Sequence, residues 1–124
     1  PPRRAGGGLA PWQQARATEY MEAHLESRIG LLELAALCQL SPSRFGRAFK
    51  ASTGVTPHRW LVARRLARAR QLMLGSDATL AAIAQQCGFS DQSHLAREFR
   101  RAEGVGPAEF RRLHPGRGGR RFAP

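Results

Sequence analysis

The stretch IAQQCGFSDQSHLAREFRRAEGVGPAEFRR, residues 83–112, decides the fold because a similar stretch occurs earlier in the chain. Its counterpart is LAALCQLSPSRFGRAFKASTGVTP, residues 34–57. The two align at an offset of 49 as far as Ser41 and Ser90, and at an offset of 50 from Phe45 and Leu95 onward. A two-fold repeat of this period in a chain of 124 residues indicates two copies of one supersecondary unit.

Each copy has the pattern of a helix, a tight turn and a second helix. In the first copy, apolar residues at helical spacing predict a helix over residues 31–38. Ser41 can cap the second helix through its hydroxyl, and Pro42 suits the first helical position because it has no N–H to leave unpaired. That helix is expected to run to about residue 52, with Gly54 in the left-handed conformation that ends it.

The second copy follows the same plan with different capping residues. Asp77 is expected to cap a helix that ends near Cys87, and Gly88 suits a left-handed turn. Ser90 is then expected to cap a helix over about residues 91–102, in which Asp91 occupies the first turn. The sequence therefore predicts helix–turn–helix units at about residues 31–53 and 77–104.

Outside the two units, the sequence predicts three further helices and two terminal tails. Residues 57–74 contain no internal Gly or Pro and predict one long connecting helix capped by Thr56. An opening helix over about residues 11–25 and a final helix from Pro107 complete a domain over residues 11–113. No strand is predicted, so the expected fold class is all-α. Residues 1–10 and 114–124 are rich in Pro, Gly and Arg and are expected to be a linker and a basic tail.

The composition of the chain limits which class of partner it is expected to bind. The chain has 20 Lys+Arg against 9 Asp+Glu, a formal net charge of +11, and Lys50 is its only lysine. Arginine presents a planar fork of donors that suits phosphate and guanine, which makes nucleic acid the leading partner. No apolar run is long enough to cross a membrane, and two cysteines cannot form a disulfide framework. We expect no membrane partner.

The second helix of each unit has one apolar and one polar face. The apolar faces, expected to be buried, are Phe45, Ala48 and Phe49 in the first helix and Leu95, Phe99 and Ala102 in the second. The opposite faces comprise Ser43, Gly46, Arg47 and Lys50, and Gln92, Ser93, Ala96, Arg97 and Arg100. Such residues suit DNA: Arg pairs with guanine, Gln with adenine, Ser with either base, and Ala with a thymine methyl.

The two quoted stretches, together with RLARARQLML at residues 65–74, resemble the DNA-binding domain of AraC/XylS-type transcriptional regulators. The resemblance covers most of residues 11–112. It implies seven helices, with recognition helices at about residues 42–52 and 91–102 that enter successive major grooves of double-stranded DNA. It also implies a cytoplasmic, nucleoid-associated bacterial regulator, an effector or dimerisation domain ahead of this one, and RNA polymerase as a further partner.

The resemblance assigns base-reading roles to individual residues. Base reading is expected from Ser43, Gly46, Arg47, Gln92, Ser93, Ala96 and Arg97. Phosphate contacts are expected from Ser41, Arg44, Lys50, Ser90, Arg100, Arg101 and Arg111. Three positions depart from the family pattern. Gln39 replaces a turn glycine, which costs about 1 kcal/mol if its φ is positive; Gly46 lacks a base-reading side chain; and Leu95 stands where phenylalanine is common.

The remaining candidate residues favour structural roles. Cys38 and Cys87 lie at matching positions and are expected to be small buried side chains, because no Cys/His cluster accompanies them. Trp60 and Phe110 also match and are expected to anchor each unit to its following helix. Arg65 and Arg68 fit either an internal ion pair or a DNA contact. The histidines His24, His58, His94 and His114 show no metal-ligand spacing.

No catalytic motif is present, so the sequence predicts neither an enzyme nor a cofactor. Two alternatives to sequence-specific DNA binding remain open. One is a non-specific or architectural nucleic-acid binder whose Arg-rich tails supply most of the affinity. The other is a protein-interaction module that docks its apolar helix faces on a partner.

Overall fold

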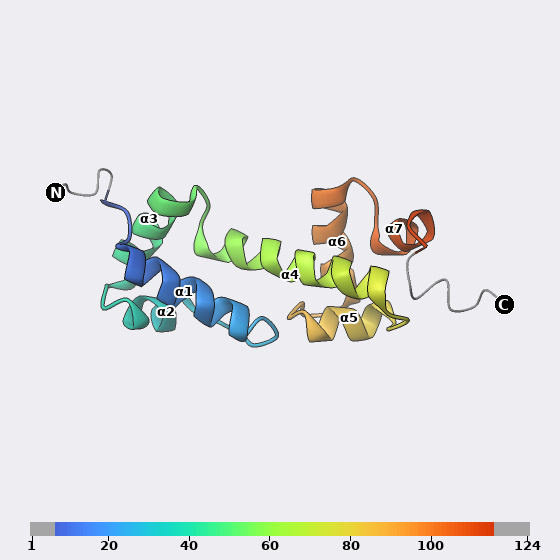
Figure 1. Ribbon diagram of the computed structural model, residues 1–124, viewed down its shortest axis with the longest axis horizontal. Coiled ribbons are helices and arrows are strands. Elements are labelled where there is room, and N and C mark those ends of the chain that lie inside the picture. The colour runs from blue at the N-terminus through green and yellow to red at the C-terminus, as the bar shows by residue number, and fades with distance from the viewer. Residues whose placement is uncertain (1–6, 116–124) are drawn as a thin grey trace. The chain divides into compact units, whose positions relative to one another are not determined.

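The computed structural model describes residues 7–115, which form seven helices and no strand (Figure 1). The predicted all-α class and helix number are therefore confirmed. The helices are α1 (Pro11–Ala23), α2 (Leu31–Leu37), α3 (Pro42–Thr53), α4 (Pro57–Gly75), α5 (Leu80–Gln86), α6 (Gln92–Glu103) and α7 (Pro107–Leu113). Most of the predicted tail residues lie outside the described range.

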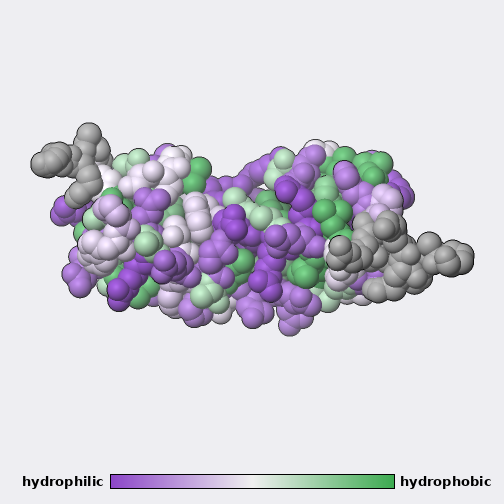
Figure 2. Space-filling model, viewed as in Figure 1, coloured by the Kyte–Doolittle hydropathy of each residue, from purple (hydrophilic) through white to green (hydrophobic). Residues whose placement is uncertain are grey.

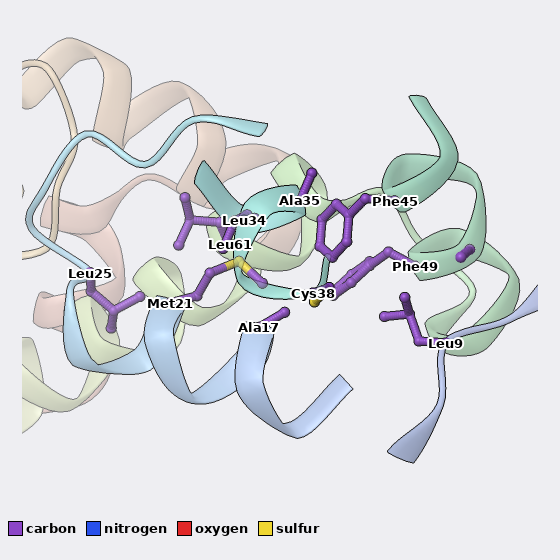
Figure 3. Close-up of a cluster of buried hydrophobic side chains, with 11 residues drawn as sticks. Leu9, Ala17, Met21, Leu25, Leu34, Ala35, Cys38, Phe45, Phe49 and Leu61 are labelled. Atoms are coloured by element: carbon purple, nitrogen blue, oxygen red, sulfur yellow. The ribbon is translucent and has the colours of Figure 1, made fainter. Parts of the chain in front are cut away.

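The chain divides into two compact units at a boundary inside α4, between Leu61 and Val62. Unit 1 contains α1 to α3 and the start of α4. Its core joins residues of all these helices, and Figure 3 shows Phe45, Phe49, Met21 and Leu61 in one cluster. Unit 2 contains the rest of α4 and α5 to α7, with a separate core. Each copy of the repeat therefore folds around its own apolar residues.

An aromatic pair fastens each second helix to the helix that follows it. In unit 1, the Phe49 and Trp60 rings meet edge to face with centroids 6.3 Å apart. In unit 2, Phe99 and Phe110 make the equivalent contact at 5.1 Å. Edge-to-face pairs stabilise a fold beyond the area that they bury. The anchoring roles predicted for Trp60 and Phe110 are confirmed.

Two of the predicted helix caps are confirmed and two are wrong. The Ser41 hydroxyl accepts a hydrogen bond from the Arg44 N–H at 3.2 Å, and Thr56 caps α4 in the same way. In unit 2, however, Thr79 caps α5 by accepting from the Ala82 N–H at 3.1 Å, whereas Asp77 was expected. Asp91 caps α6 in place of Ser90, because its carboxylate accepts from the His94 N–H at 2.8 Å.

The turn inside each unit depends on one residue with positive φ. Gly88 has φ of +92° and Gln39 has φ of +59°. The same hydrogen bond closes both turns, from Leu40 N–H to Ala35 O and from Phe89 N–H to Ala84 O. Gln39 is the only non-glycine residue with positive φ in the described part of the chain. The turn in which Gln39 replaces the usual glycine of the family is therefore strained.

Replacing Gln39 with Gly is expected to stabilise unit 1 by up to about 1 kcal/mol, because glycine adopts this φ without the Cβ penalty. The measurement is the thermal midpoint of the unit 1 transition, which should rise by about 4–8 °C per kcal/mol for a unit of this size. Gly88→Ala is the matched control and should destabilise unit 2. An unchanged or lower midpoint for Gln39→Gly would show that the Gln39 side chain compensates for its backbone.

The expected linker over residues 1–10 is wrong for its last residues. Leu9 is buried in the core of unit 1, and its N–H donates to the Ser52 hydroxyl on α3 at 2.7 Å. A side chain at Gly8 would come within 2.6 Å of the same hydroxyl, so this segment lies directly against the last turn of α3. The packed part of unit 1 therefore begins before α1.

Candidate nucleic-acid interface

The second helix of each unit, α3 or α6, is held by the same arrangement. An oxygen of the capping side chain fixes its first turn, through Ser41 in α3 and Asp91 in α6. Its last turn ends at a glycine with positive φ, Gly54 in α3 and Gly104 in α6. Both helices have twelve residues. The two units thus present second helices of equal length with equivalent fixed ends.

The buried faces of these helices are largely as predicted. Phe45, Phe49, Leu95 and Phe99 are fully buried, and Ala48 is nearly so. Ala102 is exposed, which corrects the expectation that it is buried. It lies in the last turn of α6, and its counterpart Ser52 in α3 is exposed as well. The core therefore holds each helix through its first three turns.

The opposite faces carry the predicted base-reading residues at the surface. Ser43, Arg47, Gln92, Ser93 and Arg97 are exposed, and the small residues Gly46 and Ala96 are half-buried. Within residues 7–115, the guanidinium of neither Arg47 nor Arg97 forms a hydrogen bond or an ion pair with a protein group. These two arginines occupy equivalent positions of the repeat. Each unit therefore offers one unengaged guanidinium at the same place on its second helix.

The charge on these helices favours an anionic partner. Helix α3 carries three cations and no acid. Helix α6 carries three arginines and two glutamates, but Glu103 pairs with Arg70 and Glu98 lies 3.9 Å from Arg101. Exposed ion pairs of this kind stabilise little, so Arg101 can still turn toward another anion. Figure 2 shows hydrophilic residues over much of the visible surface of both units.

The residues expected to contact phosphate lie in different surroundings. Ser41, Arg44, Lys50, Ser90, Arg100 and Arg101 are exposed. The Ser90 hydroxyl and His94 Nδ1 are 3.2 Å apart, and the His94 ring lies edge-on to Phe89. A Cβ at Gly106 would lie 3.0 Å from the guanidinium of Arg100, which therefore rests against the start of α7.

Arg111 has a role that the sequence did not suggest. Its guanidinium donates to the carbonyls of Met73, Ser76 and Ala78 at 3.2, 2.7 and 2.7 Å. These carbonyls lie at the end of α4 and in the loop that leads to α5. A guanidinium shared among three main-chain carbonyls ties α7 to this loop. We therefore do not assign Arg111 to phosphate.

Arg111→Met is expected to destabilise unit 2 by about 1–2 kcal/mol, because three carbonyls lose a charged donor and the part-exposed site lets water replace it in part. Urea unfolding measures this loss. The salt dependence of DNA binding should not change, because the guanidinium faces main-chain carbonyls. A slope lower by about one would return Arg111 to the phosphate contacts.

Arg65 and the cysteines face the interior. Arg65 is buried, and burial lowers the pKa of its guanidinium from the ordinary value. Its burial argues against the DNA-contact alternative for this residue. Arg68 is exposed. Cys38 and Cys87 are fully buried, as predicted. Burial raises the pKa of the Cys38 thiol, which donates to the Gln13 carbonyl at 3.3 Å. A neutral buried thiol is a packing group and a poor nucleophile.

Residues 7–115 lack two further kinds of feature. None of their helices combines the length and the apolar character that a membrane span requires. The same residues contain no group of three or more His, Cys, Asp or Glu side chains placed to hold a metal ion.

Comparison with known proteins identifies the family. The family model described as "Helix-turn-helix domain" matches residues 34–113, more than half of the chain. A solved regulator from Chromobacterium violaceum, whose description names AraC-type DNA-binding domain-containing proteins, is 28% identical with a TM-score of 0.76. The match covers 86% of this chain and 95% of that one. The chain is an AraC-type helix–turn–helix domain.

Two further relatives place the AraC-type domain among regulators. The DNA-binding domain of AdpA, described as a global transcriptional factor and solved with a target DNA, is 32% identical with a TM-score of 0.78, covering 82% of this chain and 91% of that one. The probable transcriptional regulator LumQ of Photobacterium leiognathi is 38% identical over 91 residues, which are 73% of this chain and 37% of LumQ. The AraC-type domain spans about a third of the length of the curated relatives it matches.

Proposed function

We propose that this chain binds double-stranded DNA sequence-specifically, with α3 and α6 as recognition helices in successive major grooves. The observation that carries the proposal is the matched pair Arg47 and Arg97. Both are exposed, have no protein partner among the described residues, and project from helices whose ends are capped in equivalent ways. An arginine on a helix that fits the major groove can donate two hydrogen bonds to guanine.

The other residues of the two faces divide between base reading and phosphate contact. Gln92 suits adenine, and Ser43 and Ser93 suit several bases. Gly46 and Ala96 let the backbone approach the groove closely. The proposed phosphate contacts are Ser41, Arg44, Lys50, Ser90, Arg100 and Arg101. We expect weaker sequence preference from α3 than from α6, because Gly46 offers no side chain where Ala96 offers a methyl.

We propose further that the domain is part of a larger cytoplasmic bacterial regulator. Its curated relatives are about three times as long as the matched region, so effector sensing or dimerisation would belong to another domain. RNA polymerase is the expected protein partner of such a regulator.

Selection of bound sequences from random duplexes tests the proposal. We expect enrichment of two boxes separated by about one helical turn, 10–10.5 base pairs, because successive major grooves on one face repeat at about 34 Å. Absence of any enriched sequence would contradict specific reading. A single enriched box would show that only one of the two helices reads bases.

A second candidate, non-specific binding, is favoured by the net charge of +11. The two candidates differ in what remains after the Arg-rich ends are removed. A chain limited to residues 8–115 retains Leu9, which is buried in the core of unit 1 and contributes to its packing. Sequence preference should survive this truncation if α3 and α6 read bases. Loss of nearly all affinity, with no preference left, would support a non-specific binder.

A further inference from the structure

A pocket of about 410 Å³ lies in unit 1 beside the recognition helix α3. Its inner wall is aliphatic, and Figure 3 shows three of its residues, Met21, Leu34 and Leu61, within the core. Leu31 at the start of α2 and Gly46 of α3 border it, and Thr56 and His58 lie where α4 begins. Its volume is within the range of small-molecule sites in proteins.

Unit 2 has a hollow at the equivalent positions. Its lining includes Leu80, Ala96, Pro107 and Ala108, which match Leu31, Gly46, Pro57 and His58 in the repeat, and its volume is about 380 Å³. Its chemistry is different, because Gln92, Arg100, Glu109 and Arg112 also line it. The repeat therefore creates a hollow beside each recognition helix, and only the one in unit 2 has charged walls.

The walls of the unit 1 pocket define what it can hold. Among the described residues, no Lys, Arg, Asp or Glu lines it, in a chain where such residues make up 23% of the sequence. Its polar groups are the Thr56 hydroxyl and the His58 imidazole. The Thr56 hydroxyl oxygen accepts the Arg59 N–H, so its own proton is available for a ligand acceptor. A charged ligand would lose its hydration there and meet no Lys, Arg, Asp or Glu side chain of opposite charge.

We propose that this pocket binds a neutral, largely apolar small molecule that carries a hydrogen-bond acceptor. The aliphatic walls bury the body of the molecule, and Thr56 or His58 donates to its acceptor. Gly46 belongs both to this pocket and to the proposed DNA-reading face, so an occupant changes how α3 meets DNA. This last step rests on the proposed function, whereas binding of the small molecule does not.

Coumarin is a suitable probe, since it is neutral and largely apolar and has a carbonyl acceptor. Titration of the DNA-free chain, followed by amide NMR shifts, is expected to give saturable changes around Leu31, Gly46 and His58, with a Kd below about 1 mM. Changes spread over both units, or none, would overturn the proposal. Coumarin-3-carboxylate should bind at least tenfold more weakly, and equal or tighter binding would refute a neutral ligand.

A pair of neighbouring variants provides the matched control. Leu31→Glu places a charge on the pocket wall, and Leu32→Glu places it one residue away, at a side chain that is 72% exposed and does not line the pocket. Both positions lie in the first turn of α2, where glutamate is favourable, so both variants should fold. Leu31→Glu should weaken coumarin binding at least tenfold and Leu32→Glu should leave it unchanged. If both variants weaken coumarin binding equally, the proposed site is wrong.

The effect on DNA is measured separately, by fluorescence anisotropy of the selected duplex with and without saturating coumarin. We expect at least a threefold change in the Kd for DNA. If coumarin binds and the Kd for DNA does not change, the pocket is a ligand site but its occupant does not affect how α3 binds DNA. If no duplex is bound specifically, the proposed function fails, while the NMR result still decides the pocket.

Discussion

Arg97→Ala is expected to weaken binding to the selected duplex by about 1–3 kcal/mol, which is about 5- to 150-fold in Kd. The physical reason is that Arg97 is exposed on α6 and has no protein partner within the described residues, so its donors are available for a base edge. Binding to random duplexes should change little. Fluorescence anisotropy with both duplexes at one fixed salt concentration measures the difference.

Lys50→Ala is the control for Arg97→Ala, because a phosphate contact carries no sequence information. Lys50 lies in the last turn of α3, and its loss should weaken binding to all duplexes alike and lower the salt slope by about one. If Arg97→Ala behaves like Lys50→Ala, then Arg97 contacts phosphate, and base reading by α6 must come from Gln92 and Ser93.

Phe99→Ala is expected to destabilise unit 2 by about 3–5 kcal/mol, the usual loss for removal of a buried phenylalanine ring. Phe99 is fully buried and packs edge to face on Phe110, so the cavity would lie at the centre of the unit 2 core. A unit of this size has little stability to lose. Amides of α5 and α6 should lose hydrogen-exchange protection, while those of α1 and α2 keep it.

Phe45→Ala is the reciprocal variant, because Phe45 is equally buried in the core of unit 1. It should leave α5 and α6 protected and expose the amides of unit 1. Loss of protection in both units from either variant would show that the two cores unfold as one. In the expected case a single thermal midpoint does not describe the whole chain, since the two units unfold separately.

Local sequence signals predicted the helices of unit 1 well. Pro42 behind Ser41, and Gly54 at the far end, bounded α3 to within one residue of its observed limits. These signals work because a cap or a left-handed glycine satisfies backbone groups only a few residues away. At the start of α5, Asp77 and Thr79 lie two residues apart and both can cap the helix. The repeat separates these two candidates, since Thr79 matches the N-cap residue Gly30 at the offset of 49.

Contacts between distant residues could not be predicted in this way. Arg111 looks like one more surface cation in a basic segment, and its carbonyl partners lie more than 30 residues earlier. Leu9 and Ala10 lie between three glycines and a proline, a composition typical of linkers. The burial of Leu9 depends on the place where Ser52 lies in the folded unit. The pocket beside Gly46 likewise exists only after four helices, α1 to α4, have packed.

The contact between Leu9 and Ser52 gives the chain ahead of α1 a mechanical connection to DNA reading. Tension on that chain acts on α3 through one hydrogen bond and one buried side chain. Both contacts lie near the C-terminal end of α3, opposite the N-cap Ser41. A protein fused in front of residue 8 could therefore strain or release the recognition helix without touching DNA itself.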